Sequence, residues 1–449
     1  MEIAFSVTFQ IVSSIFLIFL FISIWKHIRL NIEINKIMLF DLVFFFSVSK
    51  VTLYYFLPAV LRAFSGMSID LDAGRDPVTI AHIYAIEVVS WSLWIVPFLF
   101  YSVVKNKSTV KHNPENYLRL KYSKYFLVFL VFGFFITRLQ IILQGEVSGL
   151  LIAFQSVFSY AGKAAGPLLL VLSLNYFGRK YFVIGLVGTI FGIASYGTRG
   201  ALVYTFILLI FLSFFILKNK KVNKVIVFSF ISLALSFFLL GGLTGISYTV
   251  NEEGQAEIGV GLNERKLNEQ NPFQKIEDRF GAPTRIGSAF IDMYERGEGA
   301  NGAPIINSAL AVLPRVLNPE KPIPNTLNGD DLYSQGMYLI FREVYGYNTF
   351  QMVEFPTGGH FYWQFGYLGV VLLSLISGMY ILASVIFYSR FGIVGIAFLF
   401  AAFKPWGYVD TKIWVSDIVL QSYQVVLPTL VLVFLFGFMT RMLKGLRRI

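Results

Sequence analysis

The sequence is dominated by apolar segments long enough to cross a lipid bilayer. A spanning helix needs roughly 20 mostly apolar residues, because each residue advances it by about 1.5 Å through a hydrocarbon layer about 30 Å thick. Apolar residues make up 56% of the 449 residues and charged residues only 14%. This composition predicts an all-α polytopic membrane protein with about eleven transmembrane helices. The expected spans are 5–25, 38–57, 80–104, 125–143, 161–177, 182–197, 200–217, 225–248, 361–388, 391–404 and 425–440.

Lysine and arginine residues indicate the orientation of these spans. Twenty of the 37 lie in short segments that alternate along the chain: 26–36, 105–124, 179–180, 218–224, 390 and 441–449. Short basic loops remain in the cytoplasm, so we expect the N-terminus outside and the C-terminus inside. The same clustering explains the net charge of +11 as a topology signal and argues against nucleic acid as a partner.

The chain then divides into three parts. Residues 1–248 form a first membrane bundle, 249–360 form one large extracytoplasmic loop, and 361–449 form the remaining membrane helices. The loop is rich in proline and has short amphipathic stretches such as 284–296 and 306–317. Such a segment is typical of an ordered cap over a membrane-embedded cavity.

Several classes of chemistry are excluded by the residues present. The chain has no cysteine, which excludes disulfides, thiolate metal sites and a cysteine nucleophile. It has no P-loop, dinucleotide fingerprint or Gly-x-Ser-x-Gly elbow. Carboxylates at Asp70, Asp72 and Asp76 could hold a divalent ion, but in a glycine-containing loop they are more often simply solvated.

Arginines on the expected outer side are the main candidates for a binding site. Arg199 lies in Gly197-Thr198-Arg199-Gly200, in a turn with little room outside the membrane. Its planar guanidinium suits bidentate binding of phosphate oxygens, and the glycines allow a phosphate to approach the backbone. The alternative is an interfacial arginine that reaches toward lipid headgroups.

A second cluster holds Arg279, Arg285 and Asp292. If a helix begins at Thr284 as its N-cap, Arg285 lies in the first turn, where the helix dipole disfavours a cation unless an anion is bound nearby. The alternative is a salt bridge within the loop. A third cluster carries Arg315 and Lys321 on a proline-braced strip, whose flanking apolar residues suggest that it is packed down.

The fourth cluster lies where the loop re-enters the membrane. It contains Glu354 and His360, the latter beside Gly358 and Gly359 at a helix entrance. A histidine there could act as a general base or could donate to a phosphate or sugar hydroxyl. It could equally be an ordinary interfacial residue, and the aromatic run that follows it could be a membrane belt.

These four clusters together resemble the O-antigen repeat-unit polymerases (Wzy-type). The resemblance rests on Gly197-Thr198-Arg199-Gly200, Thr284-Arg285, the proline strip 314–322 and the segment 356–369, and it covers roughly residues 165–375. It implies a GT-C-like polymerase or ligase bundle in the bacterial inner (cytoplasmic) membrane. It also implies metal-independent, inverting glycosyl transfer without a cofactor.

In such enzymes a polyprenyl-diphosphate-linked oligosaccharide is the donor, a lipid-linked repeat unit is the acceptor, and a chain-length regulator can be a partner. The resemblance assigns the diphosphate to Arg199 and Arg285, with Arg279, Arg315 and Lys321 as further candidates. Deprotonation of the acceptor hydroxyl would fall to His360, Glu354 or Asp292, in that order. The alternatives are an O-antigen-ligase-type transferase or a lipid-linked oligosaccharide flippase.

Overall fold

We describe the protein from a computed structural model of the full chain. The described residues are 2–31, 34–65, 77–104, 120–144, 153–194, 199–216, 245–250, 256–261, 272–313, 316–331, 334–336, 339–340, 356–403 and 411–446, and every structural statement below concerns these residues.

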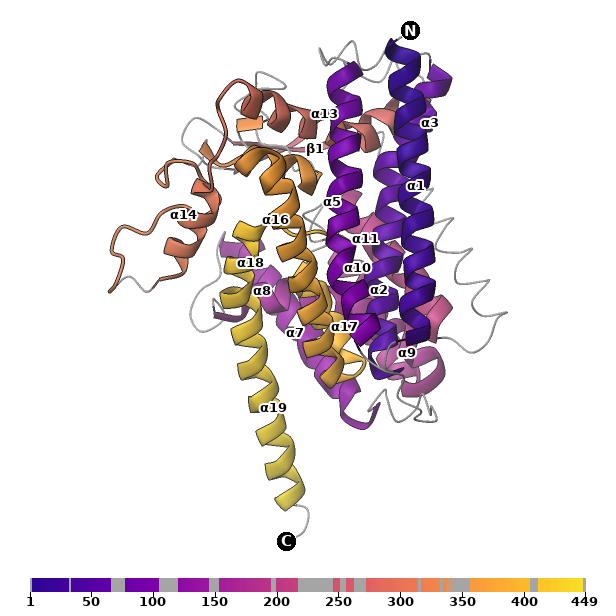
Figure 1. The fold of residues 1–449 in the computed structure, drawn as a ribbon. Helices are drawn as coiled ribbons and strands as arrows, with labels where there is room; N and C mark the ends of the chain where they lie inside the picture. Colours follow the sequence, from indigo (N-terminus) through magenta and orange to yellow (C-terminus); the bar gives the residue numbers. More distant parts are fainter. Residues whose placement is uncertain are drawn as a thin grey trace.

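The described fold is almost entirely helical (Figure 1). Its main helices in the first part of the chain are α1 (Glu2–Asn31), α2 (Ile34–Val51), α3 (Leu57–Ser65), α5 (Pro77–Val104), α7 (Leu120–Gln144), α8 (Gln155–Val157), α9 (Lys163–Leu172), α10 (Arg179–Ala194) and α11 (Arg199–Ile216). The later ones are α13 (Pro272–Glu295), α14 (Ala303–Val312), α16 (Thr357–Tyr388), α17 (Val394–Phe403), α18 (Val415–Gln421) and α19 (Leu427–Leu446). Short π-helical turns join α2 to α3 at Thr52–Phe56 and α18 to α19 at Ser422–Val426.

Within the described residues, six helices are long and apolar enough to cross a membrane. They are Ala4–Asn31, Lys36–Phe64, Pro77–Val104, Ser123–Ile141, Thr357–Phe391 and Val415–Phe438. Each coincides with one of the predicted spans. The chain therefore has the form of a multi-pass helical membrane protein.

Short helices occupy most of the other predicted spans. All ten residues of α9 and all ten of α17 are buried, so these helices lie in the protein interior. Glycines allow α9 and α10 to pack backbone to backbone, since a Cβ at Gly166 would lie 2.9 Å from the carbonyl carbon of Gly188. The predicted spans 161–177, 182–197, 200–217 and 391–404 thus correspond to helical segments, namely α9 with the π-helical turns on either side of it, α10, α11 and α17.

Two expectations about the loop are wrong. The predicted span 225–248 cannot reach residue 248, because strand β1 (Gly245–Val250) begins three residues earlier and pairs antiparallel with β2 (Ala256–Gly261). Thr284 is not a helix N-cap, since α13 continues from Pro272 through Pro283 to Glu295. Arg285 therefore lies in mid-helix and not in a first turn. The rest of 217–244 is outside the described residues.

Helix α16 is broken near its start. Phe365 and Gly366 leave the helical conformation, with Gly366 at φ 59° and ψ −144°. Only glycine adopts this backbone conformation easily. The break separates a short first segment, which begins at Thr357, from the long apolar segment that packs along α5.

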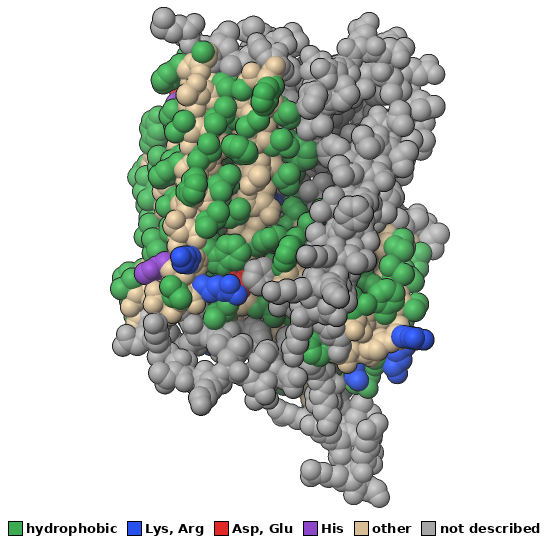
Figure 2. Space-filling model, turned by 90° about the vertical axis from the view of Figure 1, so that its right-hand side faces the viewer, with side chains coloured by type: hydrophobic (Ala, Val, Ile, Leu, Met, Phe, Trp, Pro, Cys, Tyr) green, Lys and Arg blue, Asp and Glu red, His purple; other side chains and the backbone are tan. Residues whose placement is uncertain are grey.

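The outer face of α1 is apolar along most of its length. Figure 2 shows this face as a band of hydrophobic side chains that ends, at its lower edge, in lysine, arginine and histidine side chains. Phe5, Phe16 and Phe19 are all at least half exposed there, whereas Leu17 and Phe21 are buried on the opposite face. Such a face suits a lipid environment, because hydrocarbon makes no demand for polar side chains.

Candidate functional site

Three segments that are distant in sequence meet where α16 begins. The ring of Pro356 lies against Gly287 of α13, where an added Cβ would be 2.7 Å from Pro356 Cγ. At Gly359 an added Cβ would be 2.9 Å from the Gly287 carbonyl oxygen. Only glycine permits both approaches. Helix α13 therefore contacts the 356–360 segment at Gly287, two residues after Arg285, although about seventy residues separate the two segments.

His360 lies inside an aromatic enclosure at this junction. It is 2% exposed and stacks on Trp414, with ring centroids 3.9 Å apart and an interplanar angle of 7°. The ring of Phe290 packs edge-on at 5.4 Å. Nε2 lies 3.4 Å from Nε2 of Gln364, and Nδ1 has no hydrogen-bond partner among the described residues.

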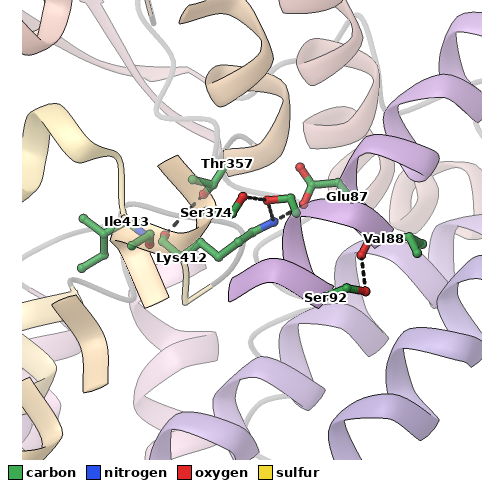
Figure 3. Close-up of polar contacts among 9 residues, drawn as sticks. Glu87, Val88, Ser92, Thr357, Ser374, Lys412 and Ile413 are labelled. Atoms are coloured by element: carbon green, nitrogen blue, oxygen red, sulfur yellow. Dashed lines mark hydrogen bonds and ion pairs between the residues drawn. The ribbon is translucent and has the colours of Figure 1, made fainter. Parts of the chain in front are cut away.

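A buried ion pair lies beside this enclosure (Figure 3). The Lys412 ammonium forms a salt bridge with Glu87 of α5, and both side chains are fully buried. Lys412 Nζ also donates to Ser90 Oγ at 3.0 Å and lies 4.4 Å from the ring centroid of Trp91. Ser90 Oγ is in turn 2.7 Å from Ser374 Oγ on α16. A buried charge is tolerated when its partner and hydrogen bonds replace water, and here Lys412 and Glu87 Oε2 pair directly.

The segment 411–414 links the ion pair to the histidine. Thr357 Oγ1 donates to the Lys412 carbonyl at 3.3 Å, and the Ile413 N–H donates to Ser377 Oγ at 2.8 Å. Figure 3 shows Lys412 reaching from this segment toward Glu87, with Thr357 and Ile413 beside it. These anchors fix the backbone that carries Trp414, and they thereby position the stacking partner of His360.

Arg62 is a second buried cation near α13. Its guanidinium donates to Gln10 Oε1 of α1 at 2.8 Å. It also donates to the Gly281 carbonyl and to Thr284 Oγ1, both at 3.4 Å. One fully buried guanidinium therefore joins α1, α3 and the turn of α13 that precedes Arg285. Its planar fork suits this task because its donors point in fixed directions.

The structure brings together some of the predicted site residues. Arg285 is 5% exposed on α13, and Asp292 lies two turns further along the same helix, half-buried. His360 is enclosed close to α13 through Phe290. Lys321 is exposed in the segment after α14, whereas Arg285 and His360 are buried.

Other predicted site residues are only partly described. Arg199 and Arg279 lie on α11 and α13, but their side chains are outside the described residues, as are Arg315 and Glu354 altogether. Tyr54, in the π-helical turn between α2 and α3, links α11 indirectly to α13: its hydroxyl is 2.9 Å from that of Tyr204, and its ring packs on Phe280. Asp70, Asp72 and Asp76 are also outside the described residues, within which no three His, Asp or Glu side chains group as metal ligands.

Sequence reasoning missed Glu87, Lys412 and Arg62. A signal for Glu87 was present, because it lies seven residues after the start of the predicted span 80–104, and a carboxylate inside a span is unfavourable and usually functional. Lys412 and Arg62 lie between predicted spans, after 391–404 and 38–57, and the orientation of those spans predicts outer loops for both. Their burial depends on partners elsewhere in the chain.

Comparison of the chain with protein families, curated proteins and solved structures finds no match.

Proposed function

We propose that this protein polymerises oligosaccharide repeat units carried on a polyprenyl diphosphate, at the outer face of the bacterial cytoplasmic membrane. The observation that carries the proposal is the backbone contact between α13, with Thr284 and Arg285, and the 356–360 segment, with His360. These are two of the four motifs on which the resemblance to O-antigen polymerases rests. Their contact supports a single site built from both.

The chemistry requires a fixed positive site and a base. An acceptor hydroxyl attacks the anomeric carbon of the donor, the bond from that carbon to the diphosphate oxygen breaks, and the hydroxyl proton passes to the base. Arg285 and Arg199 would neutralise the charge that develops on the departing diphosphate. Neither a nucleotide nor a metal ion is needed for this role.

His360 remains the first candidate base. Its Nδ1 is buried without a hydrogen-bond partner among the described residues, and such an atom is costly unless it serves a group that binds there. Asp292 is the alternative within the described site, and it is more accessible. Glu354 is the third candidate.

A transporter of lipid-linked oligosaccharide is the second candidate function. It is favoured by one observation: several cations and a carboxylate are buried in the protein, more than the sequence indicated. They are Lys50, Arg62, Glu87, Lys163 and Lys412. Ionisable groups inside a membrane bundle often mark a transport pathway.

The glycan phenotype of a deletion strain tests the proposal. A polymerase defect leaves single repeat units on the cell surface. A ligase defect leaves full-length chains on the polyprenyl carrier, and a transporter defect strands single repeat units on the carrier at the cytoplasmic face. Either of the last two phenotypes would reject the polymerase.

A further inference from the structure

Helix α14 presents an apolar stripe that no described part of the protein covers. Ile306, Leu310 and Leu313 are 58%, 40% and 38% exposed, and Ala309 lies on the same face. Their spacing of three and four residues is that of one side of a helix. Just beyond the helix, Val316 and Leu317 are 93% and 72% exposed. The expectation that this strip is packed down is therefore wrong for Val316 and Leu317, whereas Ile323 is half-buried and Asn325 is buried.

The opposite face of α14 is fixed to the protein by polar contacts. Asn307 Nδ2 donates to the Thr326 carbonyl at 2.9 Å, and the buried Ser308 Oγ accepts from the Asn325 N–H at 3.1 Å. The side-chain amide of Asn325 then donates to Asp417 on α18 at 3.0 Å. These bonds set the rotation of α14 about its axis, so the apolar stripe must face away from the protein.

Both ends of this unit are attached to membrane-crossing helices. Before α14, the Ala300 N–H donates to the Trp363 carbonyl of α16 at 2.9 Å, and Gly302 lies against the ring of Phe365 at the break in that helix. After it, Asn325 holds α18, which opens the span Val415–Phe438. Figure 1 shows α14 beside α16 and α18, on the outside of the bundle.

The stripe continues the lipid-facing surface of those two helices. Beyond the break, α16 exposes Tyr367 and Leu368 at 60% and 62%, and the helix after α18 exposes Leu427 and Phe434 at 52% and 72%. These side chains belong to spans that cross the membrane. Helix α14 packs on α18, where the span Val415–Phe438 begins, so its uncovered apolar stripe borders the lipid around that span.

We propose that α14 and residues 316–317 lie in the bilayer, with the apolar stripe in the acyl-chain region of one leaflet. A short helix with one apolar face and one protein-bound polar face has the character of an interfacial anchor. Glu320 and Lys321, both exposed, follow the apolar residues and can reach the headgroups. The proposal concerns how the loop is held and does not depend on the proposed enzymatic activity.

Single cysteines test this placement directly, because the chain has none of its own. Leu310→Cys and Val316→Cys would each be labelled with an environment-sensitive fluorophore and reconstituted into phosphatidylcholine bilayers with or without bromine on the acyl chains. Phe434→Cys serves as the lipid-facing control and Glu298→Cys, which is also exposed, as the water-facing control.

We expect brominated lipid to reduce the fluorescence at positions 310 and 316, as it does at 434, and to leave that at 298 unchanged. Fluorescence that is insensitive to bromine and resembles that of the probe in water would overturn the proposal. Insensitivity combined with a blue-shifted emission would also overturn it, and would mean that another protein covers the stripe. Val316 makes so little contact that its replacement has no packing to disturb, which keeps the result interpretable if Leu310→Cys folds poorly.

Discussion

At the scale of single residues, the first turn of α16 depends on glycines that let other groups come close. Gly358 leaves space for the Glu87 carboxylate, and Gly359 leaves space for the Gly287 carbonyl. The motif around His360 therefore has a packing reason for its glycines, in addition to any approach of substrate. Sequence alone could place these glycines at a helix entrance, but it could not identify the carboxylate that they accommodate.

Gly358→Ala should destabilise the protein. The added Cβ would overlap the Glu87 carboxylate, which is held by Lys412 and cannot move away without breaking the ion pair. We expect a loss of about 2 kcal/mol or more, seen as a lower unfolding temperature in detergent. Gly437→Ala in α19 is the matched control, since its Cβ would meet no atom within 4 Å. Equal unfolding temperatures for the two variants would contradict the packing role.

The Glu87 and Lys412 pair should show strong coupling in a double-mutant cycle. Lys412→Met removes the ammonium and leaves a buried carboxylate, which typically costs about 3–5 kcal/mol. Glu87→Gln combined with Lys412→Met removes both charges and should recover a large part of that loss. Thermal unfolding of the two single variants and the double variant measures the coupling. Additive effects would mean that the two charges stabilise the fold independently.

Arg285→Lys and Arg199→Lys should each lower polymerisation by more than about tenfold, or about 1.4 kcal/mol of transition-state stabilisation. Lysine keeps the charge but loses the bidentate fork that a diphosphate engages. The measurement is polymer formation from lipid-linked repeat units at equal protein level in the membrane. Lys321→Ala, which changes an exposed residue, is the comparison variant, and it should retain more activity than either arginine variant. Wild-type rates in both arginine variants would move the phosphate site elsewhere.

At the scale of elements, long apolar runs predicted the six spanning helices because length and hydropathy alone decide whether a helix can cross a bilayer. The same criterion does not distinguish a helix enclosed by protein, such as α9 or α17, from one that faces lipid, since both are apolar. The helix start predicted after Pro283 was also wrong, because α13 continues through this proline. Tertiary packing on α3, α5 and α16 sustains that helix despite the missing N–H.

The break in α16 should be intolerant of a side chain. Gly366→Ala would place a Cβ 2.8 Å from the Tyr294 hydroxyl, in a backbone conformation that alanine rarely adopts. We expect a loss of roughly 1–3 kcal/mol from the backbone alone, with the steric overlap added to it. Gly297→Ala also has a positive φ, at 84°, but its Cβ would lie in open space. The difference between the two unfolding temperatures therefore reports the overlap, and no difference would show that Tyr294 yields freely.

At the scale of the whole molecule, pairing between distant segments decides the site. Arg62 donates to Thr284 of α13, which lies 222 residues later in the sequence, and Lys412 pairs with Glu87, from which 325 residues separate it. No local pattern indicates such partners, because each side chain alone reads as a loop residue or as an isolated charge in a span. Arg285 and His360 could be singled out from the sequence, since both belong to short motifs next to apolar runs, but the contact of their helices at Gly287 and Gly359 could not.

The expected orientation can be checked by labelling single introduced cysteines, because the chain has none of its own. In intact spheroplasts, a membrane-impermeant thiol reagent should label Asn268→Cys and Asn301→Cys but not Asn113→Cys or Asn223→Cys, because the basic loops stay in the cytoplasm. Permeabilised cells should label all four, which controls for accessibility. Labelling of the last two in intact spheroplasts would reverse the orientation.

The long separation of Glu87 and Lys412 also imposes an order on biosynthesis. Glu87 enters the membrane 325 residues before its partner has been translated, an interval of roughly 15–65 s at about 5–20 residues per second. During that time an ionised carboxylate in the bilayer is unfavourable by several kcal/mol. Either α5 is then shielded from lipid by other helices or by the insertion machinery, or Glu87 is protonated. A nascent protein that stops before residue 412 consequently carries an uncompensated acidic group in hydrocarbon, a defect that membrane quality control can recognise.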